Sequence, residues 1–292
     1  MPGVILGAIL PVLLTALVGY GWTRSGRAFD GTTLTLLVTD LGMPCLIFAS
    51  FAKSAMPAAA FAQAAAAVTA IILALTAAGW GTLRLFHLSP RIYLPSLAFP
   101  NVGNLGMPLA LYAFGQEGLG VAIVFFTVTS VINFTLGQAI AAGTMSWRDI
   151  LRMPLIYAVV LGLAANAAGF EPPPWLANIL SLLGGITVPL MLLQLGASLG
   201  RLKVASLPRA FLLSLVRIGM GAAIGFAVTA LFGVHGTTRA VLIQDSAMPV
   251  AVFSYVFALR WNNRPEEIAG LVVVSTLMAI LTVPALLYLL VG

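Results

Sequence analysis

Two asparagines stand beside prolines inside an otherwise apolar stretch, AFPNVGNLGMPLALYAFG. Asn101 follows Pro100 directly, and Asn104 comes three residues later, four before Pro108. Side chains three residues apart share one face of a helix, and their amides can both donate to and accept from a small polar molecule. We interpret Asn101, Asn104 and the flanking prolines as candidate substrate-binding residues. Hydrogen bonding between helices is the alternative role for the two amides.

A second polar pair precedes a proline in the stretch QDSAMPVAVF, where Gln244 and Asp245 stand before Pro249. A carboxylate inside an apolar segment is costly, and such residues are functional candidates by default. We interpret Asp245 as the site of a sodium ion or a proton, and Gln244 and Pro249 as further substrate-binding residues. A structural ion pair of Asp245, for example with Arg217, is the alternative.

Five more polar residues lie in other apolar segments of the chain. Asp40 stands four residues before a proline and is a second candidate for ion or proton binding. Arg217 could neutralise one of these acids or bind an anion, or its side chain could extend to the membrane surface. Asn133 is a further candidate substrate ligand. For Asn133, Gln138 and Gln194 alike, hydrogen bonding between helices is the favoured interpretation.

The sequence offers no set of residues typical of catalysis or of metal binding. Cys45 is the single cysteine, so a disulfide within the chain and a cysteine-rich metal site are both excluded. His87 and His235 are far apart, and the chain has no HExxH, Walker A or GxSxG motif. An enzyme would need a nucleophile and a base in one site. We therefore expect neither an enzyme nor a bound cofactor, apart from a coupling Na⁺ or H⁺.

The composition indicates that apolar helices in a lipid bilayer must position these residues. Of 292 residues, 61% are hydrophobic and only 8% are charged, with a mean hydropathy of +1.07. A bilayer core about 30 Å thick needs roughly 20 apolar residues per helix. In the eighth segment, Gly221 and Gly225 have the spacing of closely packed helices. We predict an all-α membrane protein with ten spans: 3–22, 31–52, 58–83, 92–114, 118–141, 153–170, 175–199, 207–233, 239–259 and 268–290.

The basic residues are distributed among the loops by parity and do not form a patch that would suggest nucleic acid. One side of the membrane holds two of them, Lys53 and Arg239. By the positive-inside rule the other side is cytoplasmic, so both termini face outward and the first span stays in place as a membrane anchor. We expect a multi-pass protein of the plasma membrane. Eleven basic residues define the cytoplasmic side: Arg24, Arg27, Arg84, Arg91, Arg148, Arg152, Arg201, Lys203, Arg209, Arg260 and Arg264.

The prolines predict an internal repeat. Pro44 in GMPCLIF and Pro189 in TVPLMLL are 145 residues apart, and Pro100 and Pro249 are 149 apart. Two similar offsets indicate two halves of five spans each, and because five is odd the second half must be inverted in the membrane. The predicted parts are a first repeat, a short cytoplasmic connection and a second repeat: 1–145, 146–152 and 153–292.

Spans four and nine, which hold Pro100 and Pro249, correspond in the two halves and are both interrupted. A proline inside a helix removes a backbone hydrogen bond, at about 3 kcal/mol or more, and in lipid the freed groups need protein or a wet cavity as partners. Paired interrupted helices are a pointer to a binding site at the membrane midplane. We expect the two broken stretches to cross there and to present helix N-termini to an anion.

The stretches FPNVGNLGMPL and SAMPVAVFSYVFA resemble the auxin efflux carrier family, within a wider group that contains sodium–bile acid symporters. The resemblance implies a scaffold of spans 1, 2, 6 and 7 and a mobile core of spans 3–5 and 8–10. It also implies crossing broken helices and a homodimer. The family's crossing prolines match Pro100 or Pro108 and Pro249, and the asparagine after the first of them matches Asn101.

The expected function is secondary transport of a small organic anion, by export or exchange, in which the core moves against the scaffold as an elevator. Plant members of the family have a long loop between spans five and six, whereas GTMSWRDILRM closes this connection in a few residues. This difference argues against auxin itself as the physiological substrate, and the expected substrate is an auxin-like or other carboxylate. Alternatives are sodium- or proton-coupled uptake of a mono- or dicarboxylate, and a passive channel or uniporter on the same fold.

Overall fold

The structure is a computed structural model that describes residues 2–52, 57–137, 139–140, 153–202 and 206–291. The predicted connection 146–152 and the predicted roles of Lys53, Gln138 and Lys203 lie outside these residues.

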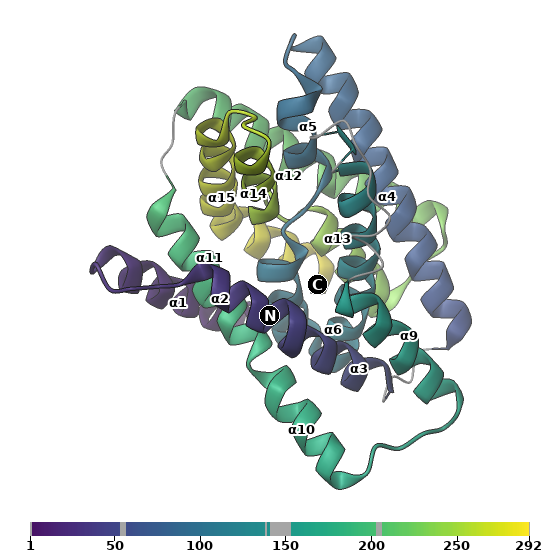
Figure 1. The fold of residues 1–292 in the computed structure, drawn as a ribbon. Coiled ribbons are helices and arrows are strands. Elements are labelled where there is room, and N and C mark those ends of the chain that lie inside the picture. The colour runs from purple at the N-terminus through teal and green to yellow at the C-terminus, as the bar shows by residue number, and fades with distance from the viewer. Residues whose placement is uncertain (1, 53–56, 138, 141–152, 203–205, 292) are drawn as a thin grey trace.

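The regular elements of the described part are helical, three of them π-helices (η), as Figure 1 shows. They are α1 Pro2–Arg24, α2 Gly31–Leu36, η1 Leu37–Gly42, α3 Met43–Ala52, α4 Ala58–Leu85, α5 Pro90–Ala98, η2 Val102–Gly106, α6 Met107–Ile132, η3 Asn133–Gly137, α9 Pro154–Ala167, α10 Pro174–Gly185, α11 Thr187–Arg201, α12 Leu207–Leu231, α13 Gly236–Ser246, α14 Val252–Arg260 and α15 Pro265–Val291.

Seven stretches of the described chain are helical, long and apolar enough to cross a bilayer, so the structure is that of an integral membrane protein. The ten predicted spans are not established by this measure, for three reasons. Val102–Gly137 runs through a kink at Gly115, where φ is 67°, and covers parts of two predicted spans. Pro154–Ala167 has only 14 residues. The breaks near Pro100 and Pro249 leave helical pieces too short to count: α5, α13 and α14.

One group of helices combines the beginning of the chain with its middle. Helix α1 packs along α11, and α3 packs against α9 and α10, an arrangement visible in the lower half of Figure 1. The contact between α1 and α11 depends on glycine, because a Cβ atom at Gly19 would collide with the backbone of Leu193 and one at Gly196 with the backbone of Ala16. These helices correspond to predicted spans 1, 2, 6 and 7.

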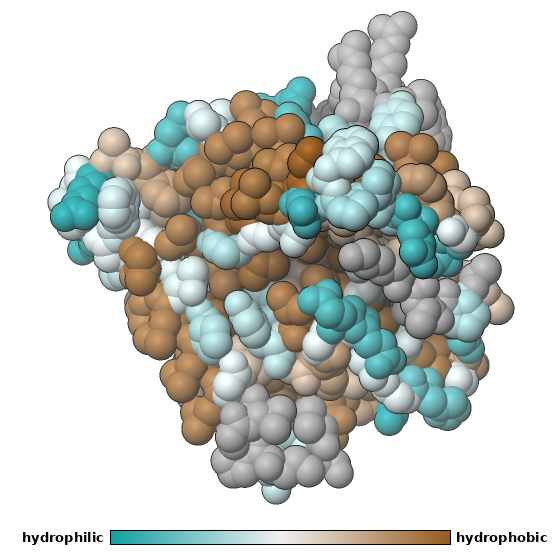
Figure 2. Space-filling model, turned by 90° about the horizontal axis from the view of Figure 1, so that it is seen from below, coloured by the Kyte–Doolittle hydropathy of each residue, from teal (hydrophilic) through white to brown (hydrophobic). Residues whose placement is uncertain are grey.

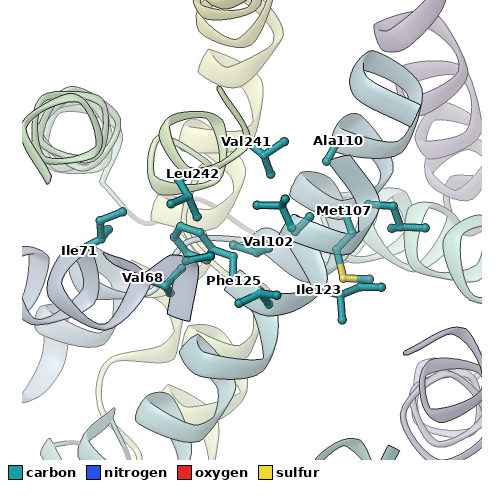
Figure 3. Close-up of a cluster of buried hydrophobic side chains, with 14 of the residues drawn as sticks. Val68, Ile71, Val102, Met107, Ala110, Ile123, Phe125, Val241 and Leu242 are labelled. Carbon is teal, nitrogen blue, oxygen red and sulfur yellow. The ribbon is translucent and has the colours of Figure 1, made fainter. Parts of the chain in front are cut away.

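The second group contains α4, α5, α6, α12, α13 and α15, which pack against one another. Figure 3 shows the contact of three of them, where Val68 of α4, Phe125 of α6 and Leu242 of α13 meet in one cluster. Each of these side chains has no exposed surface. Because lipid tails are as apolar as leucine, close packing of such side chains is what holds helices together in a membrane.

Helix α2 begins at a cap that its sequence makes recognisable. The Asp30 carboxylate accepts hydrogen bonds from the N–H groups of Thr32 and Thr33 and from the Thr33 hydroxyl. The Thr33 hydroxyl is the main cause that holds the pKa of Asp30 below its usual range. Asp is among the residues best suited to this position, because its oxygens satisfy N–H groups that have no partner inside the helix.

Large apolar side chains cover the outside of the helices. Leu85, Leu182, Leu231 and Leu281 each expose 74% or more of their surface. Figure 2 shows hydrophobic residues over much of one end of the molecule, with hydrophilic residues scattered between them. A surface of this kind suits contact with lipid.

Candidate functional site

The two interrupted stretches meet each other in antiparallel pairing. Phe99 to Asn101 separates α5 from η2, and Ala247 to Ala251 separates α13 from α14. Their backbones satisfy one another at this point, which is how groups freed by the prolines are accommodated away from water. The pairing comprises a β-bridge between Pro100 and Val250, the Asn101 N–H donating to the Pro249 carbonyl at 2.8 Å and the Ala251 N–H donating to the Phe99 carbonyl at 3.3 Å.

Asn101 lies at this meeting point and is 3% exposed. Its carbonyl accepts from the N–H groups of Leu105 and Gly106, at 3.2 and 3.1 Å, so its backbone begins η2. Its side-chain nitrogen Nδ2 is buried and has no hydrogen-bond acceptor. A buried donor without a partner carries a penalty of roughly 1–3 kcal/mol. The Asn101 amide is therefore available to a ligand.

Asn104 lies within η2 and is half-buried. The π-helix has a cause in the sequence, because Pro108 has no N–H with which to bond the Asn104 carbonyl four residues earlier. Instead, the N–H of Met107 donates to the carbonyl of Val102, five residues back. Pro108 itself is buried in the first turn of α6.

Gln244 and Asp245 lie fully buried at the end of α13, facing η2 and α6. The Gln244 amide donates to the Gly106 carbonyl at 3.2 Å and to Asp245 Oδ1 at 3.1 Å. Gln244 Oε1 and Asp245 Oδ2 have no donor. A Cβ atom at Gly106 would lie 2.6 Å from Asp245 Oδ1, so the carboxylate reaches across to the first broken helix. The two candidate pairs thus come together at one place.

Arg217 is fully buried but is not paired with Asp245. Both ion pairs found among the described residues involve Glu267, with Arg209 and with Arg264. The Arg217 guanidinium donates instead to the Ser246 carbonyl at 2.9 Å, at the C-terminal end of α13. A helix C-terminus carries partial negative charge, which favours a cation there. Nε and Nη1 of Arg217 have no acceptor.

Asn133 lies close to the first break, whereas Asp40 does not. Asn133 is 7% exposed at the start of η3, and a Cβ atom at Gly137 would contact both its Oδ1 and the ring of Phe99. Asp40 lies in η1, where it is exposed and accepts a hydrogen bond from the Thr39 hydroxyl at 2.9 Å. The structure therefore adds Asn133 to the residues around the breaks and leaves Asp40 outside them.

Other predicted polar roles have simple outcomes. The amide of Gln194 donates to the Thr35 hydroxyl at 2.5 Å, which confirms hydrogen bonding between helices. Gly221 and Gly225 lie against Ser246 of α13, which confirms them as packing residues. Ser246 Oγ donates to the Gly221 carbonyl at 2.9 Å.

The sequence reasoning missed two features of the site. Ser275 of α15 accepts a hydrogen bond from the Val250 N–H at 3.0 Å and so supports the second break. Three π-helices also escaped notice, although they hold Asp40, Asn104 and Asn133. π-Bulges are frequent at functional sites. For the π-helices that hold Asp40 and Asn104, the sequence did contain a signal, because each of these residues stands four positions before a proline.

Similar proteins were found at the level of family and of individual chains. A sequence model of the family described as membrane transport protein matches residues 4–144 and 139–287. An uncharacterized transporter of Methanothermobacter thermautotrophicus is 25% identical over 288 residues, covering 94% of this chain and 95% of that one. A candidate malonate transporter of Rhizobium meliloti is 25% identical over 66% of this chain and 64% of that one.

A plant protein is also similar to part of the chain. Auxin efflux carrier component 1 of Arabidopsis thaliana is 26% identical over 155 residues, which are 51% of this chain and 25% of the plant protein. The family match covers nearly the whole chain and confirms the resemblance expected from the two proline-containing stretches. The chain belongs to the membrane transport protein family, which includes the auxin efflux carriers.

Proposed function

We propose that this membrane transporter carries a small organic anion by alternating access, and that the anion binds where the two broken helices meet. One observation carries the proposal. The meeting point gathers buried polar atoms that lack partners, namely Asn101 Nδ2, Gln244 Oε1 and Asp245 Oδ2. Buried polar groups in proteins are nearly always hydrogen-bonded, so such a cluster favours a ligand that completes it.

The proposed substrate is a carboxylate. The Asn101 amide is a free donor for one of its oxygens, and amide donors are among the few polar groups that fix a small ligand in an apolar site. The names of the similar proteins support the same class, since one is described as carrying malonate and others as carrying auxin. Gln244, Asn104 and Asn133 would line the site with Pro100, Pro108 and Pro249.

Asp245 is the proposed coupling residue. A buried carboxylate without a cation is strongly disfavoured, and its negative charge would repel an anionic substrate nearby. A sodium ion or a proton should therefore accompany binding. Arg217, whose guanidinium donates to the Ser246 carbonyl at the end of α13, adds a positive charge that favours an anion. Asp40 lies away from this place, and a role for it in coupling would need a second site.

In the proposed movement, the two groups of helices that pack among themselves are the two parts that move relative to each other. α1 to α3 with α9 to α11 would be the scaffold, and α4 to α6 with α12 to α15 the core that moves as an elevator. The halves 1–145 and 153–292 would be inverted repeats whose broken helices form the crossing. We further propose a homodimer in the plasma membrane with both termini outside.

The test of the function uses purified protein in liposomes. Labelled malonate and phenylacetate are offered with and without a sodium gradient and at several pH values. Saturable uptake that is accelerated by unlabelled substrate on the opposite side is expected, because a carrier exposes its site alternately. Ion conductance far above carrier turnover, without such counterflow, would contradict a carrier and favour a channel. Empty liposomes are the control.

The orientation has its own test, which needs only a single reactive thiol. A cysteine introduced at Ser146 in a Cys45→Ala background should be protected from an impermeant reagent in intact cells and should react after the membrane is opened. The reason is the excess of basic residues on that side, which predicts a cytoplasmic location. Labelling from outside would reverse the proposed topology.

A further inference from the structure

A cavity of about 610 Å³ lies at the other end of α13, away from the broken stretches. Its walls come from four helices, and most of them are apolar: Phe114 of α6, Phe226 of α12 and Leu289 and Leu290 of α15. It is open on one side, and the first turn of α13 lines it with Thr237 and Arg239, among others. Pockets for small molecules have this size and this character, apolar with a few polar groups that fix orientation.

Arg239 gives the cavity a positive charge that is not paired with a carboxylate of the part of the chain that the structure describes. Its guanidinium lies over the ring of Phe226, 5.8 Å from the centroid, and it takes part in neither of the ion pairs found among the described residues, both of which Glu267 makes. Arg239 is also one of the two basic residues on the predicted non-cytoplasmic side. Basic residues are depleted on that side of membrane proteins, so its presence there calls for a local reason.

The cavity is close to the proposed substrate site along the same short helix. Arg239 precedes Asp245 by six residues in α13, which is about 9 Å along a helix at 1.5 Å per residue. The cavity and the meeting point of the broken helices therefore lie at the two ends of one short helix.

We propose that this cavity is an outer binding site for the transported organic anion, in which Arg239 holds the carboxylate and the Phe114, Phe226 and leucine side chains hold its apolar part. The inference rests on the proposed function, since it assigns a second station to the same substrate. The occupant is a free organic anion, because the cavity lies beside the helix that leads to Asp245. An anionic phospholipid has related chemistry and is the competing occupant that the test must separate.

The test measures how the cavity selects charge at an introduced thiol. Thr237→Cys in the Cys45→Ala background is treated with an anionic and with a cationic methanethiosulfonate of similar size. A charged cleft raises the local concentration of the opposite charge tenfold or more. The anionic reagent should therefore label the thiol of Thr237→Cys faster than it labels a small free thiol in solution, and the cationic reagent should show no such increase in rate. Arg239→Gln should lower the anionic-to-cationic rate ratio about fivefold or more, and Arg239→Lys should largely retain it.

Arg260→Gln is the matched control variant. Arg260 also lies over an aromatic ring, 5.3 Å from the centroid of Trp261, and is exposed, but it ends α14 and does not line the cavity. It should leave the ratio unchanged. Phenylacetate should slow the labelling of Thr237→Cys, whereas 2-phenylethanol, which has the same ring without the charge, should not. An unchanged ratio in Arg239→Gln, or equal protection by both compounds, overturns the proposal.

Two further outcomes distinguish an organic-anion site from a lipid site, and distinguish failure of this inference from failure of the proposed transport function. Protection by phosphatidylglycerol vesicles but not by phenylacetate or malonate would assign the cavity to lipid and overturn the proposal. In liposomes, Arg239→Gln should raise the KM for phenylacetate several-fold with little change in kcat. If the unmodified protein shows no counterflow of any carboxylate while the labelling results hold, the proposed function fails and an anion-binding cavity remains.

Discussion

The two broken stretches use the same backbone device but carry different chemistry. Around the first break stand neutral amides, Asn101 and Asn104, and the chain continues into the π-helix η2. The second break follows a regular α-helix, α13, which ends with Gln244, Asp245 and Ser246. In the proposed function, the first break thus supplies donors for a ligand, and the second supplies charge. Because the breaks are paired, a molecule held by one is within reach of the charge on the other.

The two buried charges beside the second break also differ in how they are compensated. Arg217 lies at the negative end of α13 and donates to the Ser246 carbonyl. Asp245 receives one hydrogen bond, from the neutral amide of Gln244. A cation at a helix C-terminus gains about 0.3–1 kcal/mol or somewhat more, whereas the carboxylate has no comparable partner. Asp245 is therefore the group whose state should change when an ion or proton binds.

The largest effect is expected from removing the charge of Asp245. Asp245→Asn keeps the shape of the side chain and its contact with Gln244, but it can neither bind Na⁺ strongly nor release a proton. Transport should lose its dependence on sodium if sodium is coupled, or on pH if a proton is coupled. Uptake into liposomes across both gradients measures this. Asp40→Asn is the control, since Asp40 is exposed and away from the breaks. Wild-type dependences in Asp245→Asn would make Asp245 a structural acid.

Replacing Arg217 should affect carboxylate transport but not the thermal stability of the protein. Arg217 makes none of the ion pairs found among the described residues, so its removal leaves no buried opposite charge unpaired, and a buried charge without a paired opposite charge is costly. Arg217→Met should therefore keep the thermal midpoint of the purified protein close to that of the wild type. Carboxylate transport should nevertheless fall by an order of magnitude or more, because the site loses its positive charge. Arg217→Lys should recover part of it. A lowered midpoint with intact transport would show that the guanidinium serves the fold.

Much of this arrangement could be predicted from the sequence, and the rest has physical reasons for being hidden. The composition predicted a membrane protein. The prolines predicted the positions of both helix breaks, because the N–H that a proline lacks removes a hydrogen bond within its own helix. The partner of Arg217 was not predictable, since it is a backbone carbonyl that every residue has. Ser275 escaped for a related reason, because its role depends on how α15 packs against the second break.

The π-helices could be predicted from the sequence only in part. Pro44 and Pro108 indicate that a carbonyl four residues earlier loses its partner, but an open kink and a shift to bonding five residues back are both possible responses. Tertiary packing decides between them. Asn133 begins a π-helix without a proline at that distance, so its sequence held no such signal.

A moderate effect is expected from Asn101. Asn101→Ala removes the donor Nδ2 that the protein leaves without a partner, while its backbone hydrogen bonds to Pro249, Leu105 and Gly106 stay in place. The binding free energy of a carboxylate should weaken by about 1–2 kcal/mol, roughly tenfold in Kd, with folding nearly intact. Binding to purified, monodisperse protein measures it. If Asn101→Ala binds as tightly as the wild type, the amide is a structural residue.

The smallest effect should come from the prolines that follow the π-helices, and it sharpens the comparison between the two packing groups. Pro108→Ala restores an N–H that can bond the Asn104 carbonyl, so η2 should tighten toward an α-helix and turn the Asn104 amide. Affinity for a carboxylate should fall a few-fold, because the amide moves while Asn101 stays. Pro44→Ala makes the same change at η1, beside Asp40, and should leave affinity unchanged. Binding measured on both variants decides the matter. Equal losses in the two would mean that the π-helices serve movement of the whole protein, whereas a loss confined to Pro108→Ala ties η2 to the ligand.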